Sequence, residues 1–285
     1  MELSAARRVR MHAQIAVMLE ELYEQESENH AAELAHHFSQ AEPVLGTEKL
    51  VIFSLLAGEQ ALAAYAYEEG LGHFQRALEA KGIPVNGEEP APDQEAAVLI
   101  RNLGWSQWAI EPRHNLTMAL KNFTRAFDYY IQAGDTDQAL AIAESPIYPL
   151  PGSQSDMAHL IRRALELIPA DSHQAGRLLS RYGIAMGQAH SDYNAAQEAF
   201  NRAMNIARSG RDPNLEMRTL ANAASVDLFH LHWEECLDKA LQAIELGRQV
   251  DDVDALFIAH YGAMNGLHRR GDLAGARHHA ETMLD

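Results

Sequence analysis

Three stretches decide the fold: SDYNAAQEAFNRAM at residues 191–204, LHWEECLDKALQAI at 231–244 and GDLAGARHHAETML at 271–284. They follow one another at a step of forty residues, and four positions recur in them: Tyr193/Trp233/Leu273, Ala196/Cys236/Ala276, Phe200/Ala240/Ala280 and Ala203/Ala243/Met283. A fixed period of this length is the signature of stacked supersecondary units, each built here from two helices. Arrays of this kind present a surface, so the pattern predicts a scaffold for recognition.

The same pattern continues toward the N-terminus at less regular steps. It fits three further sets of residues, which are Met157/Leu160/Ala164/Leu167, Leu116/Ala119/Phe123/Ala126 and Tyr67/Gly70/Phe74/Ala77. Small residues allow paired helices to approach closely, and bulky ones fill the groove between pairs. Ser191-Asp192 and Gly271-Asp272 predict the short turns within the pairs. We expect six units, with the second and third open in register because Gly134-Asp135, Ala139 and Ala143 fit a competing alignment.

The remainder of the chain also has the 3.6-residue period of helices and lacks the alternation of strands. Helices are predicted over residues 5–23, 29–40, 50–65 and 68–80, and proline-rich breaks over 81–93 and 145–156, the latter with Ser155 or Asp156 as N-cap. The expected layout is an N-terminal helical segment (1–45), a first repeat (46–82), a loop (83–93) and about five further repeats (94–285).

Composition excludes several classes of protein. The 285 residues carry a formal charge of -17, which argues against a nucleic-acid or anionic-membrane surface. The single cysteine rules out an intramolecular disulfide. No apolar run is long enough for a membrane span, and the start has no signal-peptide pattern, so we expect a cytoplasmic protein.

Two groups of residues resemble a known family. Ala57-Gly58 followed by Tyr67/Gly70/Phe74/Ala77 resembles a tetratricopeptide repeat, as does Ser191-Asp192-Tyr193 with Ala196, Phe200 and Ala203. Residues 5–80 are similar to the segment that opens the repeat domain of large bacterial signal-transduction ATPases, including LuxR-type and maltotriose-responsive activators. The resemblance implies an all-α, tetratricopeptide-like α-solenoid of antiparallel helix pairs in a right-handed superhelix. It also implies a sensor module.

The nucleotide-binding part of those regulators has no counterpart in this sequence. Their phosphate-binding loop, G-x-x-x-x-G-K-[ST], does not occur, and Gly46-Thr47-Glu48-Lys49 lacks both the first glycine and the final hydroxyl. We expect a fragment or a stand-alone relative of the sensor portion.

The sequence predicts no catalytic residues, no cofactor and no metal site, and hence no enzyme. His30, Glu33 and His37 share one helix face, but a di-iron type of site would need a second such set on a facing helix. Cys236 occupies a small-residue packing position, and Trp105 and Trp108 are expected in the core.

In tetratricopeptide arrays the first helix of each pair lines the inner groove, so the resemblance implies that a ligand binds there. Aligning the last three units directs eight side chains to that groove: Arg181, Gln188, Arg218, Asn222, Ser225, Tyr261, Asn265 and His268. Arginine and asparagine offer planar donors for a carboxylate, a phosphate or a peptide backbone. The alternative is that these residues are simply solvated.

Two functions remain open at this stage. The first is a non-catalytic regulatory module that binds a peptide, a partner domain or a small effector. The second is an architectural domain that mediates self-association into a homo-oligomer or tethers an enzyme domain such as an adenylate cyclase. Neither function involves nucleic acid or a membrane as the direct partner.

Overall fold

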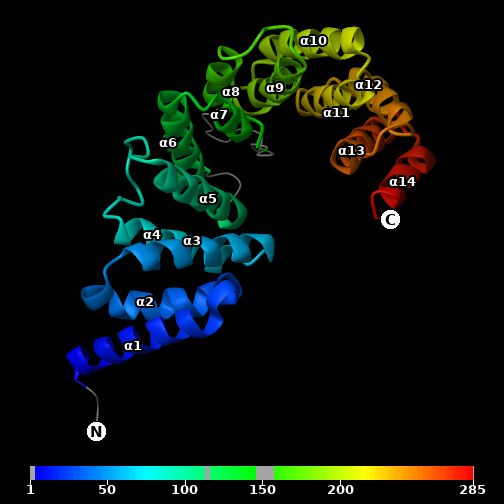
Figure 1. The fold of residues 1–285 in the computed structure, drawn as a ribbon. Coiled ribbons are helices and arrows are strands. Elements are labelled where there is room, and N and C mark those ends of the chain that lie inside the picture. The colour runs from blue at the N-terminus through cyan, green and yellow to red at the C-terminus, as the bar shows by residue number, and fades with distance from the viewer. Residues whose placement is uncertain (1–3, 113–115, 146–156, 285) are drawn as a thin grey trace. The chain divides into compact units, whose positions relative to one another are not determined.

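The computed structural model describes residues 4–112, 116–145 and 157–284, and every regular element in these ranges is a helix (Figure 1). Successive helices run α1 (Ala5–Tyr23), η1 (Glu24–His30, 3₁₀), α2 (Ala31–Leu45), α3 (Glu48–Ala63), α4 (Tyr67–Ala80), α5 (Gln94–Ile110), α6 (Thr117–Ala133), α7 (Thr136–Ala143), α8 (Met157–Leu165), α9 (His173–Ile184), η2 (Ala185–Ala189, π), α10 (Tyr193–Gly210), α11 (Pro213–Phe229), α12 (Trp233–Leu246), α13 (Val253–Arg270) and α14 (Leu273–Thr282). The predicted all-α class is confirmed.

The contacts divide the chain into two compact units, one holding α1 to α6 and the other α8 to α14. Within each unit the helices pack mainly against their neighbours in sequence, such as α3 on α4 and α11 on α12. In the second unit, alternate helices also touch, α9 with α11 and α11 with α13. These contacts give the layered packing of neighbouring helix pairs.

The forty-residue step corresponds to real helix boundaries. Tyr193, Trp233 and Leu273 are the first residues of α10, α12 and α14. The small positions behind them are packed: Ala196 and Cys236 are fully buried, and Ala276 is 6% exposed. Since each of these helices begins at the predicted residue and buries its predicted small position, the alignment of the last three pairs is confirmed.

The turns repeat at the same step as the helices. The residue just before each N-cap of α10, α12 and α14 lies in the left-handed region, with φ of 55° at Ser191, 64° at Leu231 and 85° at Gly271. This conformation strains a residue with a Cβ, and only glycine adopts it freely. The packing of α10 and α12 must therefore hold Ser191 and Leu231 in this conformation.

A second set of N-caps, at the first helices of the pairs, repeats at forty residues as well. Ser172, Asp212 and Asp252 cap α9, α11 and α13, and each side chain accepts a hydrogen bond from a backbone N–H of the first turn. A cap of this type stabilises a helix by about 1 kcal/mol.

In the first unit the predicted boundaries are close to those observed, with one correction. The 5–23 helix is α1, but the 29–40 helix begins later and ends later, as α2 from Ala31 to Leu45. Asn29 belongs to the preceding 3₁₀ turn, and α2 continues through Pro43 near its end. Pro43 has no N–H to bond to the preceding turn, and α2 ends two residues later.

The 81–93 break is an ordered connection that packs on α6. The Arg125 guanidinium donates to the carbonyl oxygens of Glu89 at 2.9 Å and Val85 at 3.4 Å, and Lys121 pairs with Glu88 at 3.0 Å. A long loop with few apolar residues is thus held by cations on the neighbouring helix.

The structure of the middle of the chain decides part of the repeat alignment that the sequence left open. Leu116, Ala119, Phe123 and Ala126 are buried at or within α6, as the pattern predicts, and the rings of Trp105 and Phe123 pack in a T-shaped arrangement with 5.4 Å between their centroids. The turn at Gly134 (φ 75°) leads into the separate short helix α7. The expected N-caps Ser155 and Asp156 lie outside the described residues.

Candidate functional site

The eight predicted groove residues all lie on the first helices of the last three pairs, on α9, η2, α11 and α13. Arg218 is turned toward the next pair: its Nη2 lies 2.6 Å from Oδ2 of Asp252, whose side chain is 3% exposed. Since Asp252 also caps α13, this ion pair ties α11 to the start of α13. Arg181 is similarly engaged, donating to the carbonyl oxygen of Ser145. Both arginines therefore contact neighbouring elements of the fold.

Three more of these residues connect adjacent first helices. Asn222, at 1% exposure, donates to the hydroxyl of Ser180 at 3.0 Å, and Gln188 donates to the hydroxyl of Ser225 at 2.8 Å. Both bonds join α11 to the α9–η2 helix. The Asn222 amide nitrogen thus helps to join two pairs, while its Oδ1 is buried without a hydrogen-bond partner among the described residues.

The last three residues, all on α13, are the accessible ones. Tyr261 is 46% exposed, His268 is exposed, and Asn265 donates to the carbonyl oxygen of Tyr261 at 2.8 Å. The predicted residues on α9, η2 and α11 therefore link neighbouring elements of the fold, whereas the three on α13 are accessible. The eight side chains do not converge on one point.

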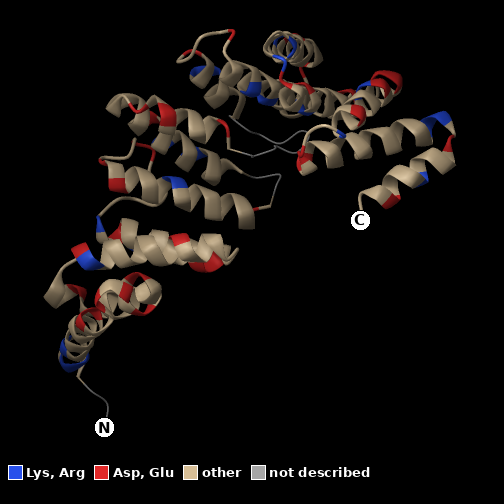
Figure 2. Ribbon diagram, turned by 45° about the vertical axis from the view of Figure 1, so that its right-hand side comes forward, with Lys and Arg blue, Asp and Glu red and all other residues tan. Residues whose placement is uncertain are grey.

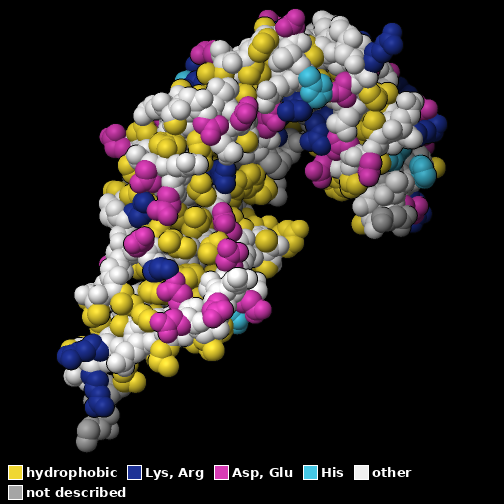
Figure 3. All heavy atoms as spheres, in the orientation of Figure 1, with side chains coloured by type: hydrophobic (Ala, Val, Ile, Leu, Met, Phe, Trp, Pro, Cys, Tyr) yellow, Lys and Arg dark blue, Asp and Glu magenta, His cyan; other side chains and the backbone are white. Residues whose placement is uncertain are grey.

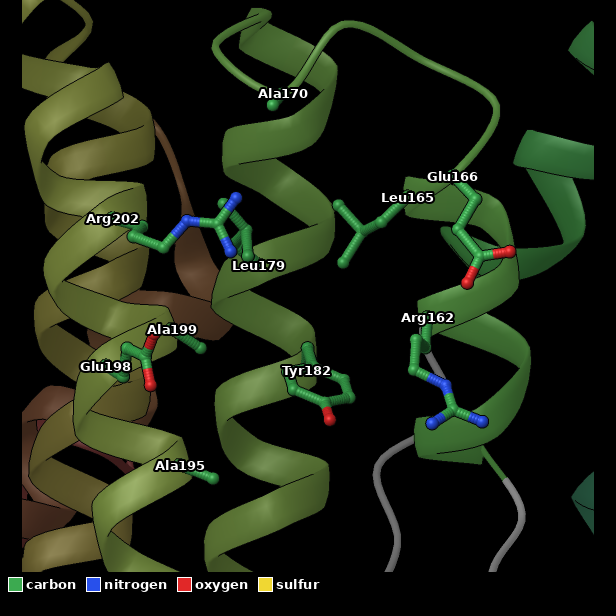
Figure 4. A pocket seen from close by; sticks show the side chains of 10 residues that line it. All are labelled: Arg162, Leu165, Glu166, Ala170, Leu179, Tyr182, Ala195, Glu198, Ala199 and Arg202. Atoms are coloured by element: carbon green, nitrogen blue, oxygen red, sulfur yellow. The ribbon is translucent and has the colours of Figure 1, made fainter.

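A better-formed site lies on the other side of α9, between α8 and α10. It is a cavity of about 340 Å³, which is within the roughly 300–1,000 Å³ of small-molecule sites. Its lining comprises Arg162, Leu165, Glu166, Ala170, Leu179, Tyr182, Ala195, Glu198, Ala199 and Arg202 (Figure 4).

The charged side chains of this cavity have opposite order on its two walls. On one wall, Arg162 of α8 precedes Glu166, the residue just after α8, by four residues, whereas on α10 Glu198 precedes Arg202 by four residues. The two helices run in the same direction because α9 packs between them and reverses the chain. Figure 4 shows Arg202 on the same level as Glu166, and Glu198 on the same level as Arg162. Each end of the cavity therefore presents one cation and one anion.

None of these four side chains forms an ion pair with another residue in the part of the chain that the structure describes; Arg162 contacts only the ring of His159, at 3.0 Å. The floor between them is apolar. Leu179 and Ala199 are 2% and 4% exposed, and Leu165 and Tyr182 pack against the same cluster. Charged rims around an apolar floor suit a ligand with both an apolar body and charged ends.

Sequence reasoning missed this cavity because it looked for a groove on the first helices, whereas α8 and α10 are second helices. One signal was available. Glu166 and Arg202 are separated by 36 residues, as are Arg162 and Glu198, and this is the step between the residue sets that begin at Met157 and Tyr193, so unlike charges occupy equivalent positions. The chain has only 23 Lys and Arg residues against 40 acidic ones, so two arginines in this relation to glutamates were worth testing.

The second unit also holds a buried polar cluster around Asp227, which is fully buried on α11. Its Oδ1 accepts from the Tyr193 hydroxyl at 2.8 Å and from the Gln197 amide at 3.1 Å, and its Oδ2 pairs with Lys239. Burial, followed by the hydrogen bond to this carboxylate, raises the pKa of Tyr193. The cluster joins α10, α11 and α12, and every member has a partner, which fits a structural role.

Cys236 is buried in the adjacent core, as its small-residue position predicts. Burial raises the pKa of its thiol to about 12, so the thiolate is scarce at neutral pH. This cysteine packs as a small apolar side chain.

The histidines of α1 and α2 do not form the metal set that was considered. His30 stacks on Tyr23 with 3.6 Å between ring centroids, while Glu33 accepts from the Tyr23 hydroxyl at 2.8 Å. His37 instead meets His12, with their Nδ1 atoms 3.0 Å apart. Within the described ranges, no group of three or more His, Cys, Asp or Glu side chains is arranged to hold a metal ion.

No model of a known protein family matches the chain, and no curated protein matches its sequence. Among the described helices, none combines the length and apolarity needed to cross a membrane.

Proposed function

We propose that the chain is a non-catalytic binding module of the tetratricopeptide type, an α-solenoid with a right-handed superhelix. In this proposal it is the cytoplasmic sensor part of a larger bacterial signalling or transcription-regulating ATPase. The support is the confirmed packing of neighbouring helix pairs, together with N-caps and turns that recur every forty residues.

The observation that carries the binding role is the cavity between α8 and α10. Arg162 and Arg202 can each donate to an anionic group, and Glu166 and Glu198 can each accept from a cationic one. We therefore place the effector in this cavity instead of on the first helices. The expected ligand is a short peptide or a similar small effector with both charges and an apolar side chain.

The overall charge of the chain supports this ligand class. A charge of -17 repels a strongly acidic ligand at long range, whereas a zwitterion has no net charge to be repelled. Each hydrogen bond to a charged group contributes roughly 1.5–3 kcal/mol. A zwitterionic peptide anchored at both ends is consequently favoured over a phosphorylated one.

Isothermal titration calorimetry with a panel of apolar zwitterionic di- and tripeptides tests the proposal. Arg202→Ala should weaken binding of the peptides that bind by about tenfold or more, because it removes one charged hydrogen bond. The matched control is Arg248→Ala, an exposed arginine that pairs with Glu245, three residues before it.

Two outcomes would contradict the proposal. One is that no peptide in the panel binds, and the other is that both arginine variants bind equally well. A lower melting temperature in Arg202→Ala, with unchanged affinity, would assign this arginine to bracing α10.

The architectural alternative, self-association or tethering of an enzyme domain such as a cyclase, is supported by a different observation. Large apolar side chains are exposed on both α1 and α13, including Leu22 at 73% and Phe257 at 54%. Exposed apolar faces of this kind mark interaction surfaces.

A further inference from the structure

The cavity between α8 and α10 offers four charged groups, and a single zwitterion uses only two of them. One end of the cavity has Arg202 and Glu166, and the other has Glu198 and Arg162 (Figure 4). A peptide that places its carboxylate at one end and its ammonium group at the other leaves one cation and one anion without a partner. A ligand that engages all four groups would carry both charges at each of its ends.

The four charges alternate between the walls of the cavity as well as between its ends. Arg162 and Glu198 are 36 residues apart, and so are Glu166 and Arg202, so each end has its cation on one wall and its anion on the other. An α-amino-acid group carries a carboxylate and an ammonium group on one carbon atom, and the two point in different directions. Such a group, held at either end, can direct its carboxylate to the arginine and its ammonium group to the glutamate.

The reversed order of charges determines how the two ends of the ligand are related. The arginine belongs to the α10 wall at one end of the cavity and to the α8 wall at the other. The two carboxylates of the ligand must therefore point to opposite walls, and so must its two ammonium groups. Two identical groups meet this condition when one is turned by half a turn relative to the other, which rotation about the single bonds of a linker allows.

The distance between the two ends of the cavity sets the length of that linker. Glu198 and Arg202 are four residues apart on α10, which is about 6 Å along the helix axis at 1.5 Å per residue. An extended chain with three methylene groups between two α-carbon atoms has four carbon–carbon bonds of about 1.5 Å each and spans about 5 Å. The rotatable arginine and glutamate side chains can cover the small remainder.

The floor of the cavity between its charged ends is apolar. Leu179 and Ala199 are buried there, and Leu165 and Tyr182 pack against the same cluster. Figure 4 shows Leu165 and Leu179 nearer one charged end and Tyr182 nearer the other. Methylene groups laid on this floor would leave water without losing a hydrogen bond, whereas a polar linker would lose its hydration. A short linker of methylene groups therefore suits the floor.

The negative charge of the protein favours a ligand whose own charges balance. Acidic residues lie on helices of both units (Figure 2), and on the face that Figure 3 shows they are scattered and do not gather in one patch. The formal charge of -17 is therefore spread over the protein. Two carboxylates without ammonium groups would be repelled by it, whereas two α-amino-acid groups carry no net charge.

Building on the proposed binding function of this cavity, we propose that its ligand is a bis(α-amino acid), a molecule with an α-amino-acid group at each end of a short methylene linker. All four charged groups of the rim then have a partner in one ligand. Diaminopimelate has three methylene groups in its linker and therefore has the required length. It is the probe in both experiments.

The first experiment is titration calorimetry with diaminopimelate and three analogues. Lysine lacks one of its carboxylates, aminopimelate lacks one of its ammonium groups, and norleucine lacks one whole α-amino-acid end. Lysine and aminopimelate should each bind about tenfold more weakly than diaminopimelate, because each lacks the charged hydrogen bonds of one group. Norleucine should bind about 100-fold more weakly.

The order of the analogues separates specific contacts from the general field of the protein. Lysine has a net positive charge and aminopimelate a net negative one, so the field alone would make lysine the tightest ligand. That order would overturn the proposal, and so would equal binding of norleucine and diaminopimelate, or no binding of diaminopimelate. If zwitterionic peptides still bound in any of these cases, the binding function of the cavity would stand and only the bis(α-amino acid) would be excluded. If neither kind of ligand bound, both proposals would be contradicted.

The second experiment uses variants of the rim to assign each group of the ligand to its partner. Glu166→Gln should bind diaminopimelate about tenfold more weakly than the wild-type chain does, but aminopimelate almost equally well, because aminopimelate can leave its missing ammonium group at that end. Arg202→Gln should likewise weaken diaminopimelate and leave lysine almost unchanged. Both side chains are exposed, so neither variant should change the melting temperature.

The matched control is Glu245→Gln, a change at an exposed glutamate that pairs with Arg248 and lies outside the cavity. It should alter the binding of none of these ligands. Equal losses of diaminopimelate and aminopimelate in Glu166→Gln would refute the contact between Glu166 and the second ammonium group, and with it the binding of a ligand at all four charges.

Discussion

Replacing Gly58 by alanine should push α3 and α4 apart. A Cβ atom at Gly58 would lie 2.5 Å from Cε1 and 2.6 Å from Cζ of Phe74, well inside carbon–carbon contact distance. Phe74 is fully buried, so its ring has no solvent to move into. The methyl group can be accommodated only if the ring or a whole helix shifts.

Two effects of opposite sign set the magnitude. Alanine is favoured over glycine inside a helix by about 1 kcal/mol. Overpacking a close contact typically costs about 1–3 kcal/mol. Gly72, in the interior of α4, has no atom within 4 Å of the position of an added Cβ, so Gly72→Ala gains the first term without the second. The free energies of unfolding of the two variants should therefore differ by about 1–3 kcal/mol, with Gly72→Ala the more stable.

Hydrogen exchange of the α3 and α4 amides is the appropriate measurement, because helical arrays open locally and a single global unfolding energy is poorly defined for them. Gly58→Ala should accelerate exchange in both helices, and Gly72→Ala should slow it. Equal protection in the two variants would show that the ring of Phe74 does not pack on Gly58 as described.

The structure also fixes the direction of three further effects, two on stability and one on the reactivity of a thiol. The Nδ1 atoms of His260 and His279 lie 2.9 Å apart, and both pKa values are lowered, chiefly by burial. The unfolded chain therefore binds protons at these histidines more readily than the folded chain does. The stability of the fold should be complete above about pH 6.5 and decline below it. In melting curves recorded at several pH values, His279→Gln should flatten that decline. Asp227→Ala should destabilise the second unit, toward the lower end of roughly 3–5 kcal/mol because Lys239 is partly exposed, as measured by urea unfolding. Cys236 should resist alkylation by iodoacetamide at neutral pH until denaturant is added, because burial raises the pKa of its thiol to about 12.

The fold could be predicted from the sequence wherever one residue type has one structural use. Ala196 and Cys236 are small because helices approach closely there, and both are fully buried. Ser191-Asp192 predicted a turn, and there the Asp192 carboxylate caps α10 by accepting from the N–H of Ala195 at 3.0 Å. Such positions are governed by local geometry and packing, which the forty-residue period expresses directly.

The site could not be predicted in the same way, because the role of a polar side chain depends on partners that lie far along the chain. Arg218 suggested an anion-binding group until the structure placed it on Asp252, 34 residues later. Arg202 drew no notice in the sequence, yet it faces a cavity opposite Glu166. Both are arginines on amphipathic helices, and only the packing of the pairs distinguishes them.

One repeating position shows how far the period can be trusted for function. Tyr182, Asn222 and Gly262 are forty residues apart and occupy the same place in three successive first helices. Tyr182 lines the cavity, Asn222 is buried in a bond to Ser180, and Gly262 leaves room for the Sγ of Cys236, which an added Cβ would meet at 3.4 Å. The period determines where a side chain lies, whereas its chemistry varies from unit to unit. In the proposed binding module, specific recognition would come from residues that break the pattern, and the reversed order of charges beside α8 and on α10 is such a break.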